Sequence, residues 1–388
     1  MAQPIPRKIQ ENNPDYKGKR FNTLLVDGSN ILELSTSADR RVNSEGKVYG
    51  GTMQFLLQLK LMMRKGNFRY VYVFWDGPNS GEYRAMLLPT YKSNRDKDYD
   101  LSVSGELSDY MKEVNARVKS MQEYFYSKNK AKLTERRKEK ELFYDQREVV
   151  MQCLEEVCVR QCVCDKVEAD DLIAYYVNNK KPEERIVIMS NDRDLTQLIS
   201  EDVIIYVQNQ KKFINTKNHT TEMGYNYQNV LLKKIICGDA SDSIKGIKGV
   251  GEKTLLDKFP EVKERKVELS EIIEKAKLIN EQRISDKKKP LKWAENIVNR
   301  VTDGVQGEKI YEINKKVIDL KHPILTDEAK ELMDSMMYAP IDGEGRSLSN
   351  LYRILVDENG IDEFRDENRF SSFFYEYKVL MNREINGI

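Results

Sequence analysis

The chain has 388 residues, of which 40% are hydrophobic and 33% charged, enough to form one large or two modest cores. The 64 basic and 63 acidic residues leave a net charge of +1, which excludes neither an acidic pocket nor a basic surface if the two signs are segregated. No segment approaches eighteen consecutive apolar residues, and residues 1–20 lack the apolar core of a signal peptide. We therefore expect a cytoplasmic protein with no membrane partner, and a flexible tail over residues 1–20.

Short apolar runs followed by aspartate recur along the first 240 residues. FNTLLVD ends at Asp27, RYVYVFWD ends at Asp76, and ERIVIMSNDRD places Asp192 and Asp194 just beyond its apolar part. Helical patterns such as TMQFLLQLKLMMRK separate these runs, and DVIIYVQ follows as a further candidate strand. The alternation predicts an α/β domain with a mainly parallel central sheet flanked by helices over residues 21–232.

Five cysteines are few and irregularly spaced for a chain of this length: Cys153, Cys158, Cys162, Cys164 and Cys237. Four of them cluster, so a structural zinc site is one interpretation. No histidine lies nearby, however, and the spacing is not that of a zinc site. Reduced thiols in the cytoplasm are the favoured interpretation.

Two acidic motifs are predicted to lie on helices. KVEADDLIAYYVNN should begin a helix at residues 167–169, where Glu168 and Asp171 share a face with Asp170 beside them. In GDASDS, the spacing of Asp239 and Asp242 also predicts one helix face. Each motif has a structural alternative: acidic residues favoured by the helix dipole for the first, and a helix cap with a solvated neighbour for the second.

The carboxylates are expected to converge. The carboxyl ends of parallel strands meet at one edge of a sheet, where ligands bind. Carboxylates gathered there would repel one another and raise each other's pKa unless divalent cations were bound. Oxygen ligands without histidine or cysteine favour Mg²⁺ or Mn²⁺, and a pair of ions suits displacement at a phosphodiester. The nine candidate ligands are Asp27, Asp76, Glu168, Asp170, Asp171, Asp192, Asp194, Asp239 and Asp242.

The turn GIKGVGEKT suits a different kind of ligand, a phosphate group. Gly249 and Gly251 lack side chains, so backbone N–H groups at a helix start can approach phosphate oxygens. Lys253 and Thr254 would add a charge and a hydroxyl. The pattern is typical of a helix-hairpin-helix, although a plain tight turn would have the same glycines. Together with the acidic cluster, it predicts a nucleic acid held by its backbone at one place and cut at another.

These motifs, in this order, resemble the 5′-nuclease superfamily. The resemblance rests on LLVDGSN, FWDGPNSGEYR, YKSNR, VEADDLIA, SNDRDL and GDASDSIKGIKGVGEKT, and covers residues 21 to 260. It is greatest to free-standing phage-type flap endonucleases and to phage enzymes that remove RNA primers. The fold that it implies is a PIN-like nuclease core with a helical arch at 93–150 and a helix-hairpin-helix region at 233–320.

The resemblance also implies roles for individual residues. It assigns one ion to Asp27, Asp76, Glu168 and Asp170, and a second to Asp171, Asp192, Asp194, Asp239 and Asp242, with Asp170 shared and catalytic. It places Lys92 and Arg95 at the scissile phosphate as catalytic cations. DNA contacts are expected at Arg84, Gly249, Gly251, Lys253 and Thr254. Tyr91 would either stack on a base or pack in the core.

The implied function is a metal-dependent, structure-specific 5′ nuclease. Its substrates would be 5′ flaps and 5′ ends in branched or nicked DNA, or RNA/DNA primer duplexes, during replication or repair. Two Mg²⁺ or Mn²⁺ ions are expected, and a K⁺ near residues 243–250. We also expect a monomer, with a replication clamp or a single-strand-binding protein as a further partner. A junction-resolving endonuclease of the same superfamily and a non-catalytic, structure-specific DNA-binding protein are the alternatives.

Two segments extend beyond this pattern. The arch contains SKNKAKLTERRKEK, with seven basic and two acidic residues, which would either line a passage for a single strand or simply solvate a helix. Residues 321–388 form a C-terminal helical extension that resembles nothing we can assign. Its aromatic run RFSSFFYEY, at 369–377, would either pack on the core, which we favour, or bind a partner.

Overall fold

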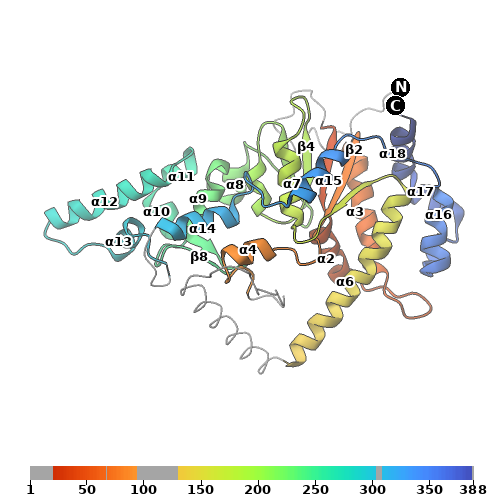
Figure 1. Ribbon diagram of the computed structural model, residues 1–388, viewed down its shortest axis with the longest axis horizontal. Helices are drawn as coiled ribbons and strands as arrows, with labels where there is room; N and C mark the ends of the chain where they lie inside the picture. The colour runs from red at the N-terminus through yellow and green to blue at the C-terminus, as the bar shows by residue number, and fades with distance from the viewer. Residues whose placement is uncertain (1–20, 67, 94–129, 303–307, 387–388) are drawn as a thin grey trace. The chain divides into compact units, whose positions relative to one another are not determined.

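The computed structural model describes residues 21–66, 68–93, 130–302 and 308–386 (Figure 1). They belong to two compact units. Of the described residues, one unit contains those within 21–78, 130–215 and 325–386, and the other those within 79–93, 216–302 and 308–324. The predicted tail, Arg95 and most of the predicted arch lie outside the described residues.

A six-stranded sheet forms the centre of the first unit, in the order β3-β2-β1-β4-β5-β6. The pairs β2–β3, β1–β2, β1–β4 and β4–β5 are parallel, and β6 is antiparallel to β5. The prediction of a mainly parallel sheet is therefore confirmed. The strands are β1 (Thr23–Asp27), β2 (Tyr70–Trp75), β3 (Arg160–Val163), β4 (Ile186–Met189), β5 (Val203–Val207) and β6 (Lys212–Ile214).

Helices cover both faces of this sheet (Figure 1). Alternate strand residues such as Val26 and Trp75 join the main core with α2 (Gly28–Ala38), α3 (Gly50–Gly66) and α6 (Lys130–Glu156). On the other face, Tyr72 packs against Tyr176 of α7 (Ala169–Asn178), with ring centroids 4.8 Å apart. The start of α7 agrees with the predicted start at residues 167–169. Strand order reverses between β1 and β4, which marks this edge as the expected ligand position.

The C-terminal segment packs against the same core. Phe374 and Tyr377 are buried there, and Tyr377 Oη donates to Leu56 O of α3 at 2.7 Å. These contacts support packing rather than partner binding for the aromatic run. Residues 325–386 thus belong to the same compact unit as the sheet. Its helical elements are α15 (Asp327–Met336), α16 (Leu348–Tyr352), η3 (Arg353–Glu358), η4 (Asp362–Phe364), α17 (Glu367–Phe373) and α18 (Tyr375–Asn386).

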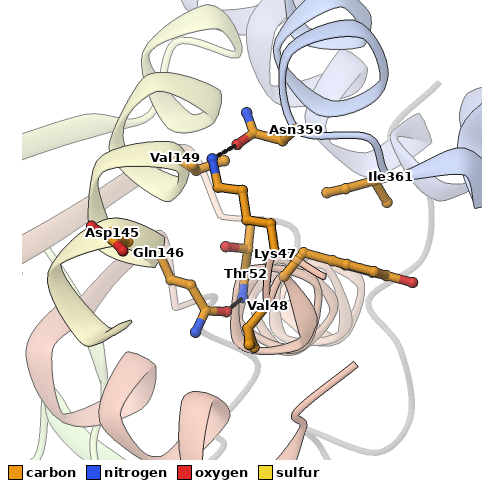
Figure 2. Close-up of a pocket in the computed structure, with 9 residues that line it drawn as sticks. Lys47, Val48, Thr52, Asp145, Gln146, Val149, Asn359 and Ile361 are labelled. Carbon is orange, nitrogen blue, oxygen red and sulfur yellow. Dashed lines mark hydrogen bonds between the residues drawn. The ribbon is translucent and has the colours of Figure 1, made fainter. Parts of the chain in front are cut away.

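The loop between α2 and α3 ties this segment to the sheet unit. Lys47 Nζ donates to Asn359 Oδ1 at 2.7 Å, beside a small pocket (Figure 2). On the opposite wall, Gln146 Oε1 of α6 accepts from Thr52 N at 2.9 Å, and Gln146 itself is buried (Figure 2). Because its amide is bound to the backbone of α3, the rotation of α6 about its own axis is fixed at this point.

The second unit is mostly helical, with a core around Ile236, Leu255 and Phe259. The sequence predicted a helix through Asp239 and Asp242, and this prediction was wrong. The preceding helix ends at Cys237, and Gly238, with a φ of 76°, turns the chain into a short hairpin. The unit contains α4 (Glu82–Leu87), α8 (His219–Met223), α9 (Val230–Cys237), β7 (Gly238–Asp239), β8 (Ile244–Lys245), α10 (Glu252–Lys258), α11 (Glu261–Glu264), α12 (Leu269–Ser285), α13 (Lys292–Val298) and α14 (Glu308–Ile318).

Among the described residues, no helix is both long enough and apolar enough to cross a bilayer.

Candidate active site

Asp27 lies at the carboxyl end of β1, where the strand order reverses. Its side chain is 3% exposed and caps α2 by accepting from Asn30 N at 3.1 Å. It also accepts from Ser190 Oγ, just after β4, at 2.8 Å. One carboxylate is thus oriented by groups at two neighbouring strand ends.

The environment of Asp27 disfavours the charged form of its carboxylate. Burial, the largest influence, and the charges of Asp76 and Asp192 together raise the pKa of Asp27 to about 7, against the hydrogen bonds from Asn30 and Ser190, which lower it. Carboxylates held this close favour either a shared proton or a bound cation. The convergence of Asp27, Asp76 and Asp192, predicted from strand ends, is thus present in the first unit.

Asp76 links the end of β2 to the start of α7. Its backbone N–H donates to Ser29 Oγ at 2.9 Å, and its carboxylate accepts from Ala169 N at 2.9 Å. The latter bond satisfies one of the free N–H groups at the helix start. It brings Asp76 beside the predicted EADD motif.

The EADD motif divides between buried and half-buried carboxylates. Glu168 and Asp171 are 4% and 1% exposed, whereas Asp170 is half-buried. All three belong to the cap and first turn of α7, where the helix dipole favours negative charge. The dipole explains how two buried carboxylates are tolerated there.

Asp192 and Asp194 follow β4 in a compact turn. Asp192 N donates to Ser190 Oγ at 3.0 Å, and Asp194 N donates to Asp192 Oδ1 at 2.8 Å. The same serine hydroxyl therefore contacts both Asp27 and the Asp192 backbone. Ser29 and Ser190 are functional-site residues that sequence reasoning missed, although both lie within two residues of a strand end.

Oxygen ligands dominate the first unit's site, as Mg²⁺ and Mn²⁺ require. Burial and the neighbouring charges of Asp76 and Asp192 disfavour the charged form of Asp27, and a divalent cation bound there would offset both effects. The residues present therefore fit a divalent metal.

The remaining two predicted ligands lie in the second unit. Asp239 Oδ2 pairs with Lys234 Nζ at 2.6 Å, and Asp239 Oδ1 accepts from Ser241 N at 2.9 Å. Burial raises the pKa of Asp239, but Lys234 and Ser241 outweigh it and lower the value to about 2. Asp239 is therefore ionised at every pH of interest. Asp242 is half-buried, and its backbone carbonyl accepts from Lys92 N at 2.8 Å.

Lys92 adopts an unusual backbone conformation. Its φ is 50°, in the left-handed region that non-glycine residues rarely occupy, and its side chain is 8% exposed. The ammonium lies 5.0 Å from the centroid of the Tyr91 ring. Such strain often accompanies functional positions, and Lys92 is the described member of the predicted catalytic pair.

Two residues predicted to contact DNA are buried and contact other residues of the protein. Arg84 is 5% exposed, and its Nε donates to Val317 O at 2.8 Å. Tyr91 is 4% exposed and packs with Ile244 and Val317. Of the two interpretations of Tyr91, this environment matches core packing.

The predicted phosphate-binding turn is open to solvent. Gly249 has a φ of 80°, which favours glycine, and a Cβ added there would meet no atom within 4 Å. Gly251 is the N-cap of α10 and has equally open surroundings. Lys253 is exposed and Thr254 half-buried in the first turn of that helix. The backbone of this turn is accessible to a large ligand.

Residues 22–224 match the family described as 5′-3′ exonuclease, N-terminal resolvase-like domain. The chain belongs to this family. The predicted resemblance to the 5′-nuclease superfamily is therefore confirmed.

Individual relatives agree with this family. The chain is 36% identical over 137 residues to a 5′-3′ exonuclease of Mycoplasmopsis pulmonis, a match that covers 34% of this chain and 45% of the relative. It is 27% identical over 245 residues to a 5′-3′ exonuclease of Halalkalibacterium halodurans, covering 60% of this chain and 67% of the relative. The matched part thus spans about half to two thirds of these relatives.

A solved structure shares the fold. The zinc-bound T5 5′-exonuclease superposes with a TM-score of 0.58 at 17% identity, covering 81% of this chain and 98% of the other. At this identity the likeness shows the fold alone.

Proposed function

We propose that the protein is a metal-dependent, structure-specific 5′ nuclease that hydrolyses phosphodiesters at 5′ flaps and 5′ ends of DNA or RNA/DNA duplexes. The observation that carries the proposal is that Asp27 is buried at the strand ends with Asp76 and Asp192 nearby, so that burial and their charges raise its pKa. Membership of the 5′-3′ exonuclease family supports the same reaction.

The carboxylates of the first unit are the proposed metal ligands. Asp27, Asp76, Glu168 and Asp170 would hold one divalent cation, Mg²⁺ or Mn²⁺. When bound, it would supply Lewis acidity for phosphodiester hydrolysis. The assignment of Asp171, Asp192, Asp194, Asp239 and Asp242 to a second ion stays a prediction.

The chain's own residues have distinct parts in this proposal. Ser190 and Asn30 orient the Asp27 carboxylate, and the start of α7 orients that of Asp76. Lys92 would neutralise charge on the scissile phosphate, and we keep Arg95 as its predicted companion. Carboxylates that are already oriented and a lysine ammonium held in place reduce the rearrangement that the site needs during the reaction.

The turn at Gly249 is the proposed binding point for a duplex arm. Its backbone is open, and Lys253 and Thr254 are placed to add contacts to phosphate oxygens. Such contacts position a substrate without reading its sequence. A K⁺ near residues 243–250 remains part of this proposal.

One experiment tests the function directly. Purified protein is mixed with labelled substrates of equal length: a 5′ DNA flap, a 5′ RNA/DNA end and an intact four-way junction, each with Mg²⁺ or with excess chelator. We expect cleavage of the flap and the 5′ end with Mg²⁺ only, leaving 5′ phosphates. Preferred cutting of the junction would favour the resolvase alternative, and full activity in chelator would refute a metal-dependent nuclease.

Asp170→Ala serves as the matched variant. It should abolish cleavage while flap binding survives, because the half-buried carboxylate would serve the metal rather than the fold. If binding and cleavage persist together, Asp170 is not a ligand. If both are lost with an unchanged unfolding temperature, the carboxylate acts on substrate binding instead.

A further inference from the structure

Arg147 of α6 has an unusual position for a cation. Its guanidinium lies over the Trp75 ring, with Cζ 5.4 Å from the ring centroid. Its Nε is buried, and within the described part of the chain it has no hydrogen-bond partner. A buried donor without a partner is costly, and more so when it carries charge. The position therefore suggests a residue kept for an external ligand.

The guanidinium lies at the active-site edge of the sheet. Trp75 is fully buried and directly precedes Asp76 in the chain. Burial lowers the pKa of Arg147, and the charges of Tyr144, Asp76 and Glu148 act in the opposite direction. Arginine stays protonated in such surroundings. Arg147 is thus a fixed positive charge near the carboxylates without forming a salt bridge to them.

The packing of α6 holds this residue in place. The adjacent Gln146 is bound to Thr52 N of α3 (Figure 2), and Val150 is fully buried. The helix cannot rotate to offer Arg147 another partner without breaking these contacts. The packing of α6 therefore holds the backbone of Arg147 beside Trp75.

An exposed aromatic residue accompanies the cation. Tyr144 precedes Arg147 by three residues, a spacing that places both on the same side of a helix. Tyr144 is 49% exposed, and its ring meets that of Phe143 edge-on at 5.4 Å. A solvent-exposed ring next to a guanidinium whose Nε has no partner among the described residues matches the chemistry that binds one nucleotide of a single strand, by stacking and by phosphate contact.

We propose that Arg147 and Tyr144 form a nucleotide subsite on α6 for the single-stranded 5′ segment of the substrate. Arg147 donates to a phosphate oxygen, and Tyr144 stacks on a base. The ligand is single-stranded because a base within a duplex has no free face for the ring. This inference rests on the proposed function, and it adds a subsite to the predicted contacts of Lys92 and Arg95.

Binding measurements in excess chelator, which prevents cleavage, test the subsite. Two substrates are compared: a duplex with a single-stranded 5′ flap, and the same nicked duplex without the flap. Arg147→Gln should weaken flap binding roughly tenfold, as expected for a lost charged hydrogen bond. It should also lower the salt dependence by about 0.7, the value for one phosphate of a single strand. Binding of the nicked duplex should be unchanged.

Matched variants separate a specific contact from loss of charge. Lys330→Gln removes one exposed positive charge from α15 and should leave the binding of both substrates unchanged. Arg147→Lys should keep most of the salt dependence but not the full affinity. Tyr144→Ala should weaken flap binding about tenfold with no change in salt slope, because stacking displaces no counterion.

Crosslinking gives an answer that does not depend on the stability of the variants. A flap carrying one 5-iodouridine at successive positions is irradiated with the wild-type protein, and the crosslinked peptide is identified. We expect the crosslink at Tyr144. Crosslinks elsewhere, together with unchanged flap binding by Tyr144→Ala, would overturn the subsite.

The outcomes distinguish this inference from the proposed function. If the wild-type protein neither binds nor cleaves flaps, both fail. If the wild-type protein binds and cleaves flaps, and Arg147→Gln weakens binding of the flap substrate and of the nicked duplex equally, then Arg147 acts on the active site as a whole and the subsite is refuted. Supporting results require the flap-specific loss.

Discussion

Ser190 Oγ donates a 2.8 Å hydrogen bond to Asp27 Oδ2, joining two residues that are 163 positions apart in the chain. The same oxygen accepts from Asp192 N at 3.0 Å. A single hydroxyl thus connects the ends of β1 and β4. It stabilises the charged form of Asp27, against burial and the neighbouring carboxylates.

Removing that hydroxyl should make the protein need more metal at neutral pH. In Ser190→Ala the pKa of Asp27 rises above its present value of about 7, so protons compete more strongly with the cation. One lost hydrogen bond of about 1 kcal/mol predicts roughly a fivefold rise in the Mg²⁺ concentration for half-maximal cleavage at pH 7. The difference should shrink at pH 9, where Asp27 is ionised in both proteins.

Ser200→Ala is the matched control for this measurement. Ser200 lies between β4 and β5, just before β5, and its hydroxyl accepts from Asp202 N at 3.3 Å, while Asp202 pairs with Arg185. Its Mg²⁺ requirement should equal that of the wild type. Equal requirements for all three proteins at pH 7 would show that the Ser190 bond does not tune Asp27.

Asp27 should also destabilise the metal-free protein as pH rises. Its folded pKa of about 7 exceeds the unfolded value of about 3.9, so the folded state binds more protons between them. Stability from this group is therefore present at pH 4 and lost as pH rises to about 7. Asp27→Asn should be more stable than the wild type at pH 8 by on the order of 2 kcal/mol, and nearly equal at pH 4.

Urea unfolding in chelator measures this difference. Adding Mg²⁺ at pH 8 should stabilise the wild type more than Asp27→Asn, since a ligand that binds only the folded state adds to its stability. A variant that is less stable than the wild type at pH 8 in chelator would contradict the raised pKa.

The sequence predicted the sheet and the strand-end aspartates because both depend on local patterns. An apolar run followed by Asp27 or Asp76 marks a buried strand and its end, and parallel pairing brings such ends together. Ser190 was missed because its role depends on a contact across the sheet. Arg147 carries no local signal, since its position over Trp75 depends on a contact between α6 and β2.

The helix predicted through Asp239 and Asp242 failed for a related reason. A spacing of three residues suits one helix face, but it also suits a turn in which an aspartate side chain accepts from the backbone two residues later. Gly238, in a left-handed conformation, decides between them by ending α9. The C-terminal segment was harder still, because its core contacts are with residues some 300 positions away, as with Tyr377 and Leu56.

Asp239 and Asp242 should differ in their effects on stability. Asp239→Asn breaks its partly buried ion pair with Lys234, which should cost about 2–3 kcal/mol, less than for a fully buried pair. Asp242→Asn should change stability by less than about 1 kcal/mol. If both are metal ligands, both variants lose cleavage. Equal unfolding midpoints for the two variants would contradict the structural role of the Asp239 pair.

The aromatic run at the C-terminus should act through packing. Phe374→Ala removes a fully buried ring and should cost about 3–5 kcal/mol of unfolding free energy. Tyr375→Ala, in which the ring removed is 51% exposed, is the matched control and should cost much less. Flap cleavage per folded molecule should stay unchanged in both. A stable Phe374→Ala variant would revive the interpretation that this run binds a partner.

Lys253 should bind a duplex arm through its phosphate backbone. The residue is exposed in the first turn of α10, directly after the open turn of Gly249 and Gly251. Lys253→Ala should weaken binding to nicked duplexes of different sequence by the same factor, and lower the salt slope by about 0.9. Lys263→Ala, which removes an exposed charge from α11, is the control and should leave the slope unchanged.

Gly249→Ala tests the backbone separately: the φ of 80° disfavours a side chain, and the new methyl group would point into the space that the phosphate would need. That variant should lose duplex affinity with a salt slope close to that of the wild type, because no charge is removed. An unchanged slope in Lys253→Ala would show that Lys253 does not contact the phosphate backbone.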